Sequence, residues 1–344
     1  MMFKHNCLFT ILISGFLMAA GCNSAETEKN RFFLKGNIAL QNGEYKQAAK
    51  YYEEAIAIDS TFADAYNNRG IARFEMGQYE LAVIDYQQAI RYDPAFADAF
   101  YNRANAYFEL KEYEKSKTDL DTVKSIYKDS AYVYFTSGLV SVGMQNYDEA
   151  VKDFDLAISL DSTNIETYIN LATVRFYQQK YDTALSHLQK AREINQEQPE
   201  IYNVLGLIFT ELQEYDTAQQ SFKQALQLDP YNPFFINNRA YLFLKQDSLE
   251  VAERELKISL DIDPMNGWAY RNLGILAMKE GDFQQAVNHF KHAEELDHSI
   301  MYLYSLLGEA LAETGKTDEA CEYLSQAAAK DELPGKNLYV KVCK

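Results

Sequence analysis

Large apolar, small and polar residues recur along the chain with a period of 34 residues. Nine consecutive segments of this pattern cover residues 29–331 without an insertion or a deletion, and the ninth runs into the C-terminal tail. The segments begin at Lys29, Ala63, Ala97, Ala131, Ile165, Pro199, Pro233, Gly267 and Met301. A period of this length predicts an array of similar units in which each unit buries its apolar face against the next.

Small residues occupy the same places of every segment, counted from 1 to 34. Place 8 is Gly or Ala in all nine segments, place 20 is Ala except for Ser116, and place 27 is Ala except for Val123 and Ser259. Large residues predominate at places 17 and 24, for example Tyr79 and Tyr86. A small residue where two helices cross lets them approach while the large residues beside it interdigitate. Each segment is therefore predicted to form two packed α-helices.

The segments resemble tetratricopeptide repeats, and Asp-Pro pairs ending at Pro94, Pro230 and Pro264 add to the resemblance because proline stops a helix. The resemblance implies an all-α fold, a right-handed superhelical solenoid of nine helix-turn-helix units at residues 29–331. Residues 332–344 are expected to form a short helix that caps the C-terminal end.

The third segment departs most from the pattern. Ser116, Leu120, Val123 and Lys128 stand in its second helix where small, aromatic, small and Pro residues are expected. Because neighbouring repeats stabilise each other through their shared interface, an irregular repeat weakens its own joint first. We therefore hypothesise a looser joint between the third and the fourth repeat.

The start of the chain follows a different pattern. Lys4 and His5 precede an apolar stretch at residues 7–18, and small residues follow it up to Cys22. The stretch is too short for a membrane-spanning helix, so the order predicts a signal peptide at residues 1–21. The alternatives are a plainly secreted protein and an uncleaved anchor.

The small residues before Cys22 resemble a bacterial lipobox, although Ala19 stands where Leu is usual. The resemblance implies cleavage before Cys22 and a lipid on its thiol, with residues 22–28 as a short linker. Several acyl chains hold a protein stably on a membrane. Asn23 favours the outer membrane under the family's sorting rule, so the expected location is the bacterial cell envelope.

Charge and composition exclude several functions. The formal net charge is −17 and the pI is about 4.8, which argues against binding to nucleic acid because its phosphates would be repelled. The chain has no glycine-rich phosphate loop and no nucleophile in a glycine-flanked turn. His289, His292 and His298 are interpreted as a solvated helix face, not a metal site. We predict no enzyme activity, no metal and no cofactor.

Two cysteines remain beyond the signal peptide and the lipidation site. Cys321 and Cys343 lie eleven residues on either side of a turn near residue 332. Two antiparallel helices would place them side by side, and an oxidising compartment would permit a disulfide that ties down the C-terminal cap. The alternative is a pair of free thiols.

The first helices of tetratricopeptide repeats line a concave groove, and the resemblance assigns places 2, 5, 6, 9, 12 and 13 to it. Place 6 is often an Asn that bonds the backbone of a bound peptide. This chain has Asn68, Asn102, Asn170, Asn238 and Asn272 there. An amide both donates and accepts, so it can pair with an extended backbone of any sequence. The alternative is that these amides bridge local groups.

The charges at the groove places are unevenly distributed. Repeats two to six carry Asp64, Glu75, Asp98, Glu109, Glu166, Glu200 and Glu211, whereas repeats seven and eight carry Lys245, Arg271 and Lys279 and no acid. The cations lie near Phe234, Tyr241 and Trp268, and Arg with aromatic residues is typical of binding hot spots. We hypothesise a basic docking patch that takes an acidic group or a terminal carboxylate of a protein partner.

These observations favour a membrane-anchored scaffold that binds extended partner segments in its groove, for envelope assembly or secretion machinery. One alternative is a binder of carbohydrate or envelope polymer, which would use the groove rings of Phe108, Tyr132, Phe135, Tyr177 and Trp268 as stacking platforms. A regulatory subunit of an envelope enzyme is the other alternative.

Overall fold

The computed structural model describes residues 25–330 and 332–344. The predicted signal peptide at residues 1–21 and the predicted lipidation site Cys22 lie outside the described residues. The chain divides into two compact units, Met1–Leu160 and Asp161–Lys344, and each is described by itself.

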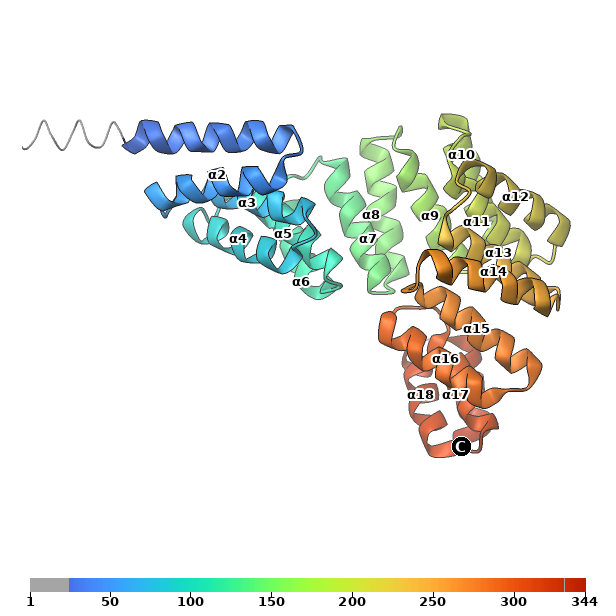
Figure 1. Ribbon diagram of the computed structural model, residues 1–344. Helices are drawn as coiled ribbons and strands as arrows, with labels where there is room; N and C mark the ends of the chain where they lie inside the picture. The colour runs from blue at the N-terminus through green and yellow to red at the C-terminus, as the bar shows by residue number, and fades with distance from the viewer. Residues whose placement is uncertain (1–24, 331) are drawn as a thin grey trace, which may run out of the picture. The chain divides into compact units, whose positions relative to one another are not determined.

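The described part of the first unit consists of helices that pair in chain order (Figure 1). We call the first helix of each pair its A helix and the second its B helix. Residues 25–41 are helical and precede α2. The later elements are α2 (Tyr45–Ile58), α3 (Ala63–Glu75), α4 (Tyr79–Tyr92), α5 (Ala97–Glu109), α6 (Tyr113–Ile126), α7 (Ala131–Gly143) and α8 (Tyr147–Leu160).

The second unit continues the same arrangement of A and B helices and ends with an additional helix (Figure 1). Its elements are α9 (Ile165–Tyr177), α10 (Tyr181–Ile194), α11 (Pro199–Glu211), α12 (Tyr215–Leu228), α13 (Pro233–Lys245), α14 (Leu249–Ile262), α15 (Gly267–Glu280), α16 (Phe283–Leu296), α17 (Leu303–Glu313), α18 (Thr317–Ala329) and α19 (Leu333–Cys343). The predicted all-α architecture of tandem helix pairs is confirmed.

Local sequence signals explain where the helices begin. Pro199 and Pro233 occupy the first turn of α11 and α13, where a missing backbone N–H costs nothing. Asn164 and Asn266 cap α9 and α15 by accepting a hydrogen bond from a backbone N–H of the first turn. The ninth repeat differs, because Tyr302 has a left-handed backbone (φ 59°) and α17 starts only after it.

The small residue at place 8 and the large residue at place 24 fit each other within a repeat. A Cβ atom on Gly206 would lie 2.6 Å from the ring of Phe222. Aromatic rings stand opposite glycine in the pairs Gly36–Tyr52, Gly70–Tyr86, Gly138–Phe154, Gly206–Phe222 and Gly274–Phe290, and leucine stands opposite alanine in Ala104–Leu120, Ala172–Leu188 and Ala240–Leu256. The close packing of protein interiors accounts for this complementarity. Gly308 with Leu324 is the exception.

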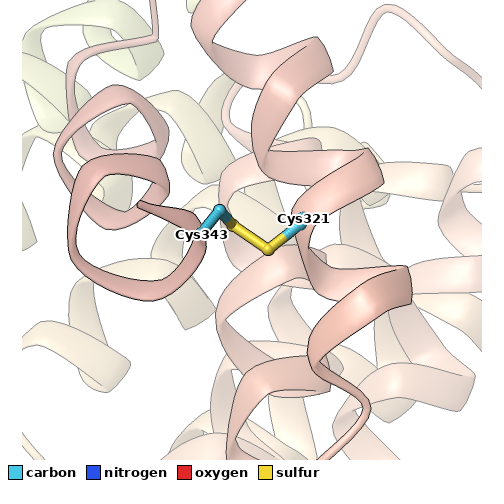
Figure 2. Close-up of a disulfide and its surroundings, with 2 residues drawn as sticks. All are labelled: Cys321 and Cys343. Carbon is cyan, nitrogen blue, oxygen red and sulfur yellow. A yellow bond between two sulfur atoms is a disulfide. The ribbon is translucent and has the colours of Figure 1, made fainter.

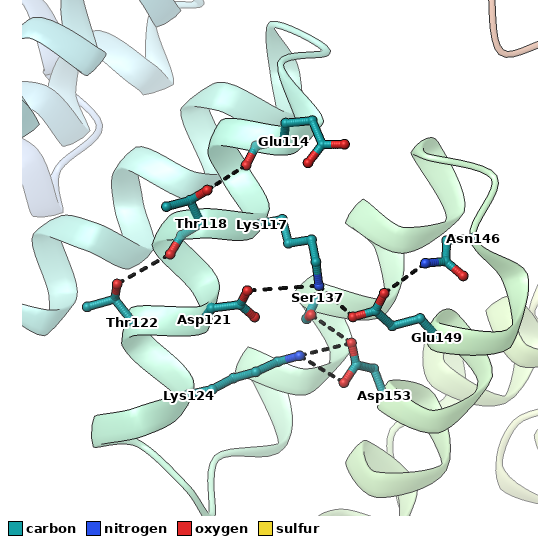
Figure 3. Close-up of polar contacts among 10 residues, drawn as sticks. All are labelled: Glu114, Lys117, Thr118, Asp121, Thr122, Lys124, Ser137, Asn146, Glu149 and Asp153. Atoms are coloured by element: carbon teal, nitrogen blue, oxygen red, sulfur yellow. Dashed lines mark hydrogen bonds and ion pairs between the residues drawn. The ribbon is translucent and has the colours of Figure 1, made fainter.

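The joint between the third and the fourth repeat carries ion pairs (Figure 3). Lys124 of α6 contacts both carboxylate oxygens of Asp153 of α8, at 2.9 and 3.0 Å, and Ser137 of α7 donates to the same carboxylate at 2.7 Å. Lys117 of α6 pairs with Glu149 of α8. The joint that the sequence predicts to be looser therefore has polar links between its B helices, and its looseness stays a prediction.

Candidate binding site

A cavity of about 760 Å³ runs along the A helices of the second unit. Its lining comes mainly from α9, α11, α13, α15 and α17, and is completed by Gln179 in the turn after α9, Tyr181 of α10, Met301 and Tyr302 before α17, and Pro334 of α19. The volume lies within the range of roughly 300–1,000 Å³ that is typical of ligand sites. Its lining includes residues at the places that the resemblance assigns to the groove, such as Asn170, Asn238 and Asn272 at place 6.

Aromatic and apolar side chains form much of the cavity wall. The rings are Phe176, Tyr177, Tyr181, Phe234, Tyr241, Trp268 and Tyr302. Phe234 is 49% exposed, so it is accessible to a partner without any movement of the helices. A wall of rings with a few polar groups is the usual composition of a site that orients an organic ligand or a side chain.

Glu211 connects two groups of the cavity. One carboxylate oxygen accepts a hydrogen bond from the hydroxyl of Tyr241 at 2.7 Å, and the other pairs with the amine of Lys245 at 3.2 Å. Burial raises the pKa of Tyr241, so its hydroxyl stays protonated and able to donate. The positive charge of Lys245 is therefore largely balanced within the protein.

Arg271 is buried, with 8% of the residue exposed. Its Nε donates to the carbonyl of Met301 at 3.1 Å, and its Nη1 donates to Oδ1 of Asn272 at 2.9 Å. The guanidinium lies 5.6 Å from the ring centres of both Tyr241 and Trp268, which is within the range of cation–π attraction. Burial lowers the pKa of Arg271, because desolvation disfavours its charged form.

The first turn of α17 explains why the Met301 carbonyl faces Arg271. The backbone N–H of Ser305 donates to the carboxylate of Glu332 at 3.2 Å, and the Ser305 hydroxyl donates to the same oxygen. The helix starts after Met301, so the Met301 carbonyl is available to the guanidinium. In a regular first turn the N–H of Ser305 would donate to the carbonyl of Met301. Here the N–H binds Glu332 and the carbonyl binds Arg271 instead.

The groove asparagines of the second unit form a chain of amide hydrogen bonds. Asn272 donates to Asn237 at 2.9 Å, Asn237 donates to Asn238 at 3.3 Å, and Asn238 donates to Asn203 at 3.0 Å. Asn170 instead donates to the backbone carbonyl of Glu166. The alternative of local bridging therefore describes what these amides do in the structure.

The first unit contains a similar chain. Asn102 donates to Asn67 at 3.0 Å, Asn67 donates to Asn68 at 3.1 Å, and Asn68 donates to Asn37 at 3.0 Å. Asn67 and Asn237 are not predicted as site residues from the sequence. A sequence pattern shared by the two residues would have indicated their role. Two successive asparagines at places 5 and 6 stand opposite an Asn of the preceding repeat.

Two of the three cations in the hypothesised basic docking patch are paired within the protein, and the docking role of the patch stays a prediction. Lys245 pairs with Glu211, Lys279 pairs with Asp247, and Arg271 is buried with hydrogen bonds to Met301 and Asn272. The reason is the stacking of repeats, since a charge at one place meets charges of the neighbouring repeat. Glu211 and Lys245 occupy place 13 of successive repeats, so their pairing could have been read from the sequence.

Other residues considered in the sequence lie elsewhere. Phe108, Tyr132 and Phe135 belong to the first unit, where each ring packs against another ring. The imidazole of His289 contacts Gln285, and that of His292 contacts Glu295. Among the described residues, no group of three His, Cys, Asp or Glu side chains is arranged to hold a metal ion.

Cys321 and Cys343 are joined by a disulfide with an S–S distance of 2.02 Å (Figure 2). The bond links α18 to the last residue of α19. Because α19 provides Pro334 to the cavity and Glu332 precedes it, the disulfide helps to hold this wall of the cavity. No helix in the described part of the chain is long and apolar enough to cross a bilayer.

Comparison with protein families identifies the repeats. Family models described as TPR repeat match residues 36–77 and 72–111, and models described as tetratricopeptide repeat match residues 98–130, 131–164, 163–230 and 271–335. A comparison with curated proteins finds no match.

Solved structures with a similar fold include a pilF protein of Pseudomonas aeruginosa and the yeast Tom70. The pilF structure has a TM-score of 0.54 at 20% identity and aligns over 63% of this chain and 99% of its own. Tom70 has a TM-score of 0.55 at 20% identity and aligns over 85% of this chain and 65% of its own. At these identities the similarity concerns the fold alone.

Proposed function

The chain belongs to the tetratricopeptide repeat family of protein-interaction scaffolds, and we propose that it is a membrane-anchored member that binds an extended segment of a partner protein. The observation that carries the proposal is the cavity of about 760 Å³ along five A helices of the second unit. Such repeat families are typically non-enzymatic, and the cavity offers rings, amides and charges for recognition.

The geometry of the cavity supports an extended ligand. Each A helix presents groove places to the same side, so the successive helices offer a series of similar contacts at regular spacing. An extended segment has side chains at a regular spacing too and can use several of these contacts in succession. Phe234 and Trp268, at place 2 of successive repeats, are the rings on which we expect such a segment to rest.

The proposed lipid anchor and the proposed cellular location are inferred from the sequence alone. Cys22 is the proposed lipid attachment site, and the bacterial envelope, with the outer membrane favoured by Asn23, is the proposed location. A scaffold held there would bring envelope proteins together, which fits a role in assembly or secretion machinery. Metabolic labelling with an alkyne fatty acid tests the anchor, because replacing Cys22 by Ser would remove the label and release the protein from the membrane.

Site-directed photocrosslinking in native membranes tests the groove. A benzophenone amino acid at Phe234 is expected to yield a protein adduct, whereas the same group at Lys257, on a B helix with a side chain that is 67% exposed, should not. An adduct at position 257 alone would contradict the proposal and place recognition on the other face.

A pair of double variants serves as the matched control. F234A/W268A removes two rings of the cavity wall, whereas Y231A/M265A removes two nearby apolar side chains that are 79% and 69% exposed but do not line the cavity. Adduct formation from a benzophenone group at Asn170 should fall only in the first variant. Undiminished crosslinking in F234A/W268A would refute binding in the cavity.

A further inference from the structure

The charges of the cavity differ in how they are balanced. Lys245 and Lys279 each form an ion pair with a carboxylate of the protein. In the described part of the chain, Arg271 forms no ion pair, although it is far more buried than either lysine. A buried charge without a counter-charge is costly, and a carboxylate of a ligand would supply the counter-charge that the protein does not.

The surroundings of Arg271 leave one part of the guanidinium unused. The rings of Tyr241 and Trp268 lie near the group, Nε is bound to Met301, and Nη1 is bound to Asn272. Within the described residues, Nη2 has no hydrogen-bond acceptor from the protein, and Arg271 lines the cavity. Nη2 is not fully buried, and since Arg271 lines the cavity, we expect a ligand in the cavity to reach it.

The nearest acids cannot serve as the missing partner. Glu211 already binds Tyr241 and Lys245, and Glu332 already binds the backbone and hydroxyl of Ser305. Both carboxylates attract the charge of Arg271 only from a distance. The fixed positions of Met301 and Asn272 further hold the guanidinium in one orientation, which is what a directional binding group requires.

We propose that Nη2 of Arg271 binds a carboxylate of the ligand inside the cavity. This inference rests on the proposed function and names the chemistry of the partner segment. A guanidinium suits a carboxylate because both are planar and their hydrogen bonds are charge-assisted. Aromatic rings beside the guanidinium favour an apolar group next to the carboxylate.

A hydrogen bond between two lining residues joins the two ends of the cavity wall along the chain, the turn after α9 and the start of α17. Nε2 of Gln179, in the turn after α9, donates to the hydroxyl of Tyr302 at 3.2 Å, and both residues line the cavity. Tyr302 keeps a left-handed backbone there, a conformation that is unfavourable for a residue with a ring. A chain end, an acidic side chain or a small free acid could each bring a carboxylate to Arg271.

Direct binding measurements on the full-length protein in detergent distinguish these sources. The probes are N-acetyl-phenylalanine, its amide, a heptapeptide with a C-terminal Phe, the same peptide as C-terminal amide, and that amide with one internal Glu. We expect each acid to bind at least about tenfold more tightly than its neutral counterpart, since a hydrogen bond to a charged group contributes about 1.5–3 kcal/mol.

Two variants make the assignment specific. Arg271→Gln removes the charge but keeps an amide donor, and it should abolish the preference for acids over amides. Lys257→Gln removes a cation of α14 that pairs with Glu253 and does not line the cavity, so the preference should change less than about threefold. A thermal melt by circular dichroism shows that both variants are folded.

The outcomes separate this proposal from the proposed function. Equal binding of acids and amides to the wild type, or an unchanged preference in Arg271→Gln, would overturn the carboxylate site even if photocrosslinking captures a partner. Binding of N-acetyl-phenylalanine alone, with no peptide bound, would support the carboxylate site and refute the partner segment. Tighter binding of the acid heptapeptide would support both.

Discussion

A Cβ atom on Gly206 would lie 2.6 Å from Cε1 of Phe222, so these two residues of α11 and α12 fill a single space. The preceding repeat fills the same space with Ala172 and Leu188, a larger residue on one helix and a smaller one on the other. The packing of a repeat therefore depends on the sum of two side-chain volumes and not on either residue alone.

Replacing Gly206 alone should destabilise the second unit, and replacing Gly206 and Phe222 together should restore its stability. Gly206→Ala forces the ring aside and is expected to cost about 1–3 kcal/mol, more than the gain in helix propensity. Adding Phe222→Leu reproduces the neighbouring pair. Denaturant unfolding and hydrogen exchange in α11 and α12 should give a coupling energy of about 0.5–3 kcal/mol between the two substitutions. Additive effects would show that the two residues do not share the space.

Replacing Lys124 by Met should loosen the joint between the third and the fourth repeat. Asp153, 8% exposed, would keep only Ser137 as a partner, and leaving a buried carboxylate short of donors is expected to cost about 1–3 kcal/mol. Hydrogen exchange in α6 to α8 measures the effect. Lys117→Met is the control, because its partner Glu149 is more exposed and such a pair contributes at most about 1 kcal/mol. The same measurement tests whether residues 116–130 exchange faster than other B helices.

The carboxyl group of Glu309, which lines the cavity, should make stability depend on pH. Burial first, and then repulsion by Glu313, raise its pKa above 4.5. Between 4.5 and the raised pKa the folded state binds more protons than the unfolded state, so stability falls as the pH rises through this window. Glu309→Gln should remove this fall. An NMR titration of the Glu309 carboxyl carbon that gives a pKa at or below 4.5 would contradict the argument, and Glu313→Gln should lower that pKa.

Loss of the disulfide should affect the C-terminal end selectively. The bond between Cys321 and Cys343 closes a loop with a sequence separation of 22, for which chain entropy predicts a stabilisation of about 3 kcal/mol. Reduction, or the double substitution by Ser, is expected to speed hydrogen exchange in α19 and to leave α3 to α5 unchanged. Because Pro334 lines the cavity, probe binding should weaken as well. Unaltered exchange in α19 would show that packing alone holds the helix.

Much of the fold could be predicted because the same sequence pattern occurs in nine successive repeats. The period, the small residues at places 8 and 20 and the large ones at place 24 appear in every repeat, and place 27 is small in all but the third, so a local ambiguity in one copy is resolved by the others. The B helices begin at place 17 in all nine repeats, from Tyr45 to Thr317. Only the ninth A helix starts late, and nothing in the repeat pattern announces the left-handed Tyr302.

The site was harder to predict, because a pattern read within repeats does not show contacts between repeats. Lys245 and Asn272 look free on their own helices, yet their partners Glu211 and Asn237 lie in the preceding repeat. The hydrogen bond from Arg271 to the Met301 carbonyl depends on the late start of α17, which leaves this carbonyl without a helical partner. Because this deviation occurs in one repeat only, the repeat pattern in the sequence does not predict it.

The contacts between repeats have a consequence for how such a chain can change. Glu211 and Lys245 are 34 residues apart, and Asn237 and Asn272 are 35 apart. Each contact specifies which repeat follows which, whereas the Gly–aromatic and Ala–Leu pairs fit inside any single repeat. Duplication or loss of one 34-residue unit would therefore preserve the helices and their packing but bring mismatched polar side chains together. The order of the repeats is encoded in these few polar residues, and they limit the recombination that the regular core alone would permit.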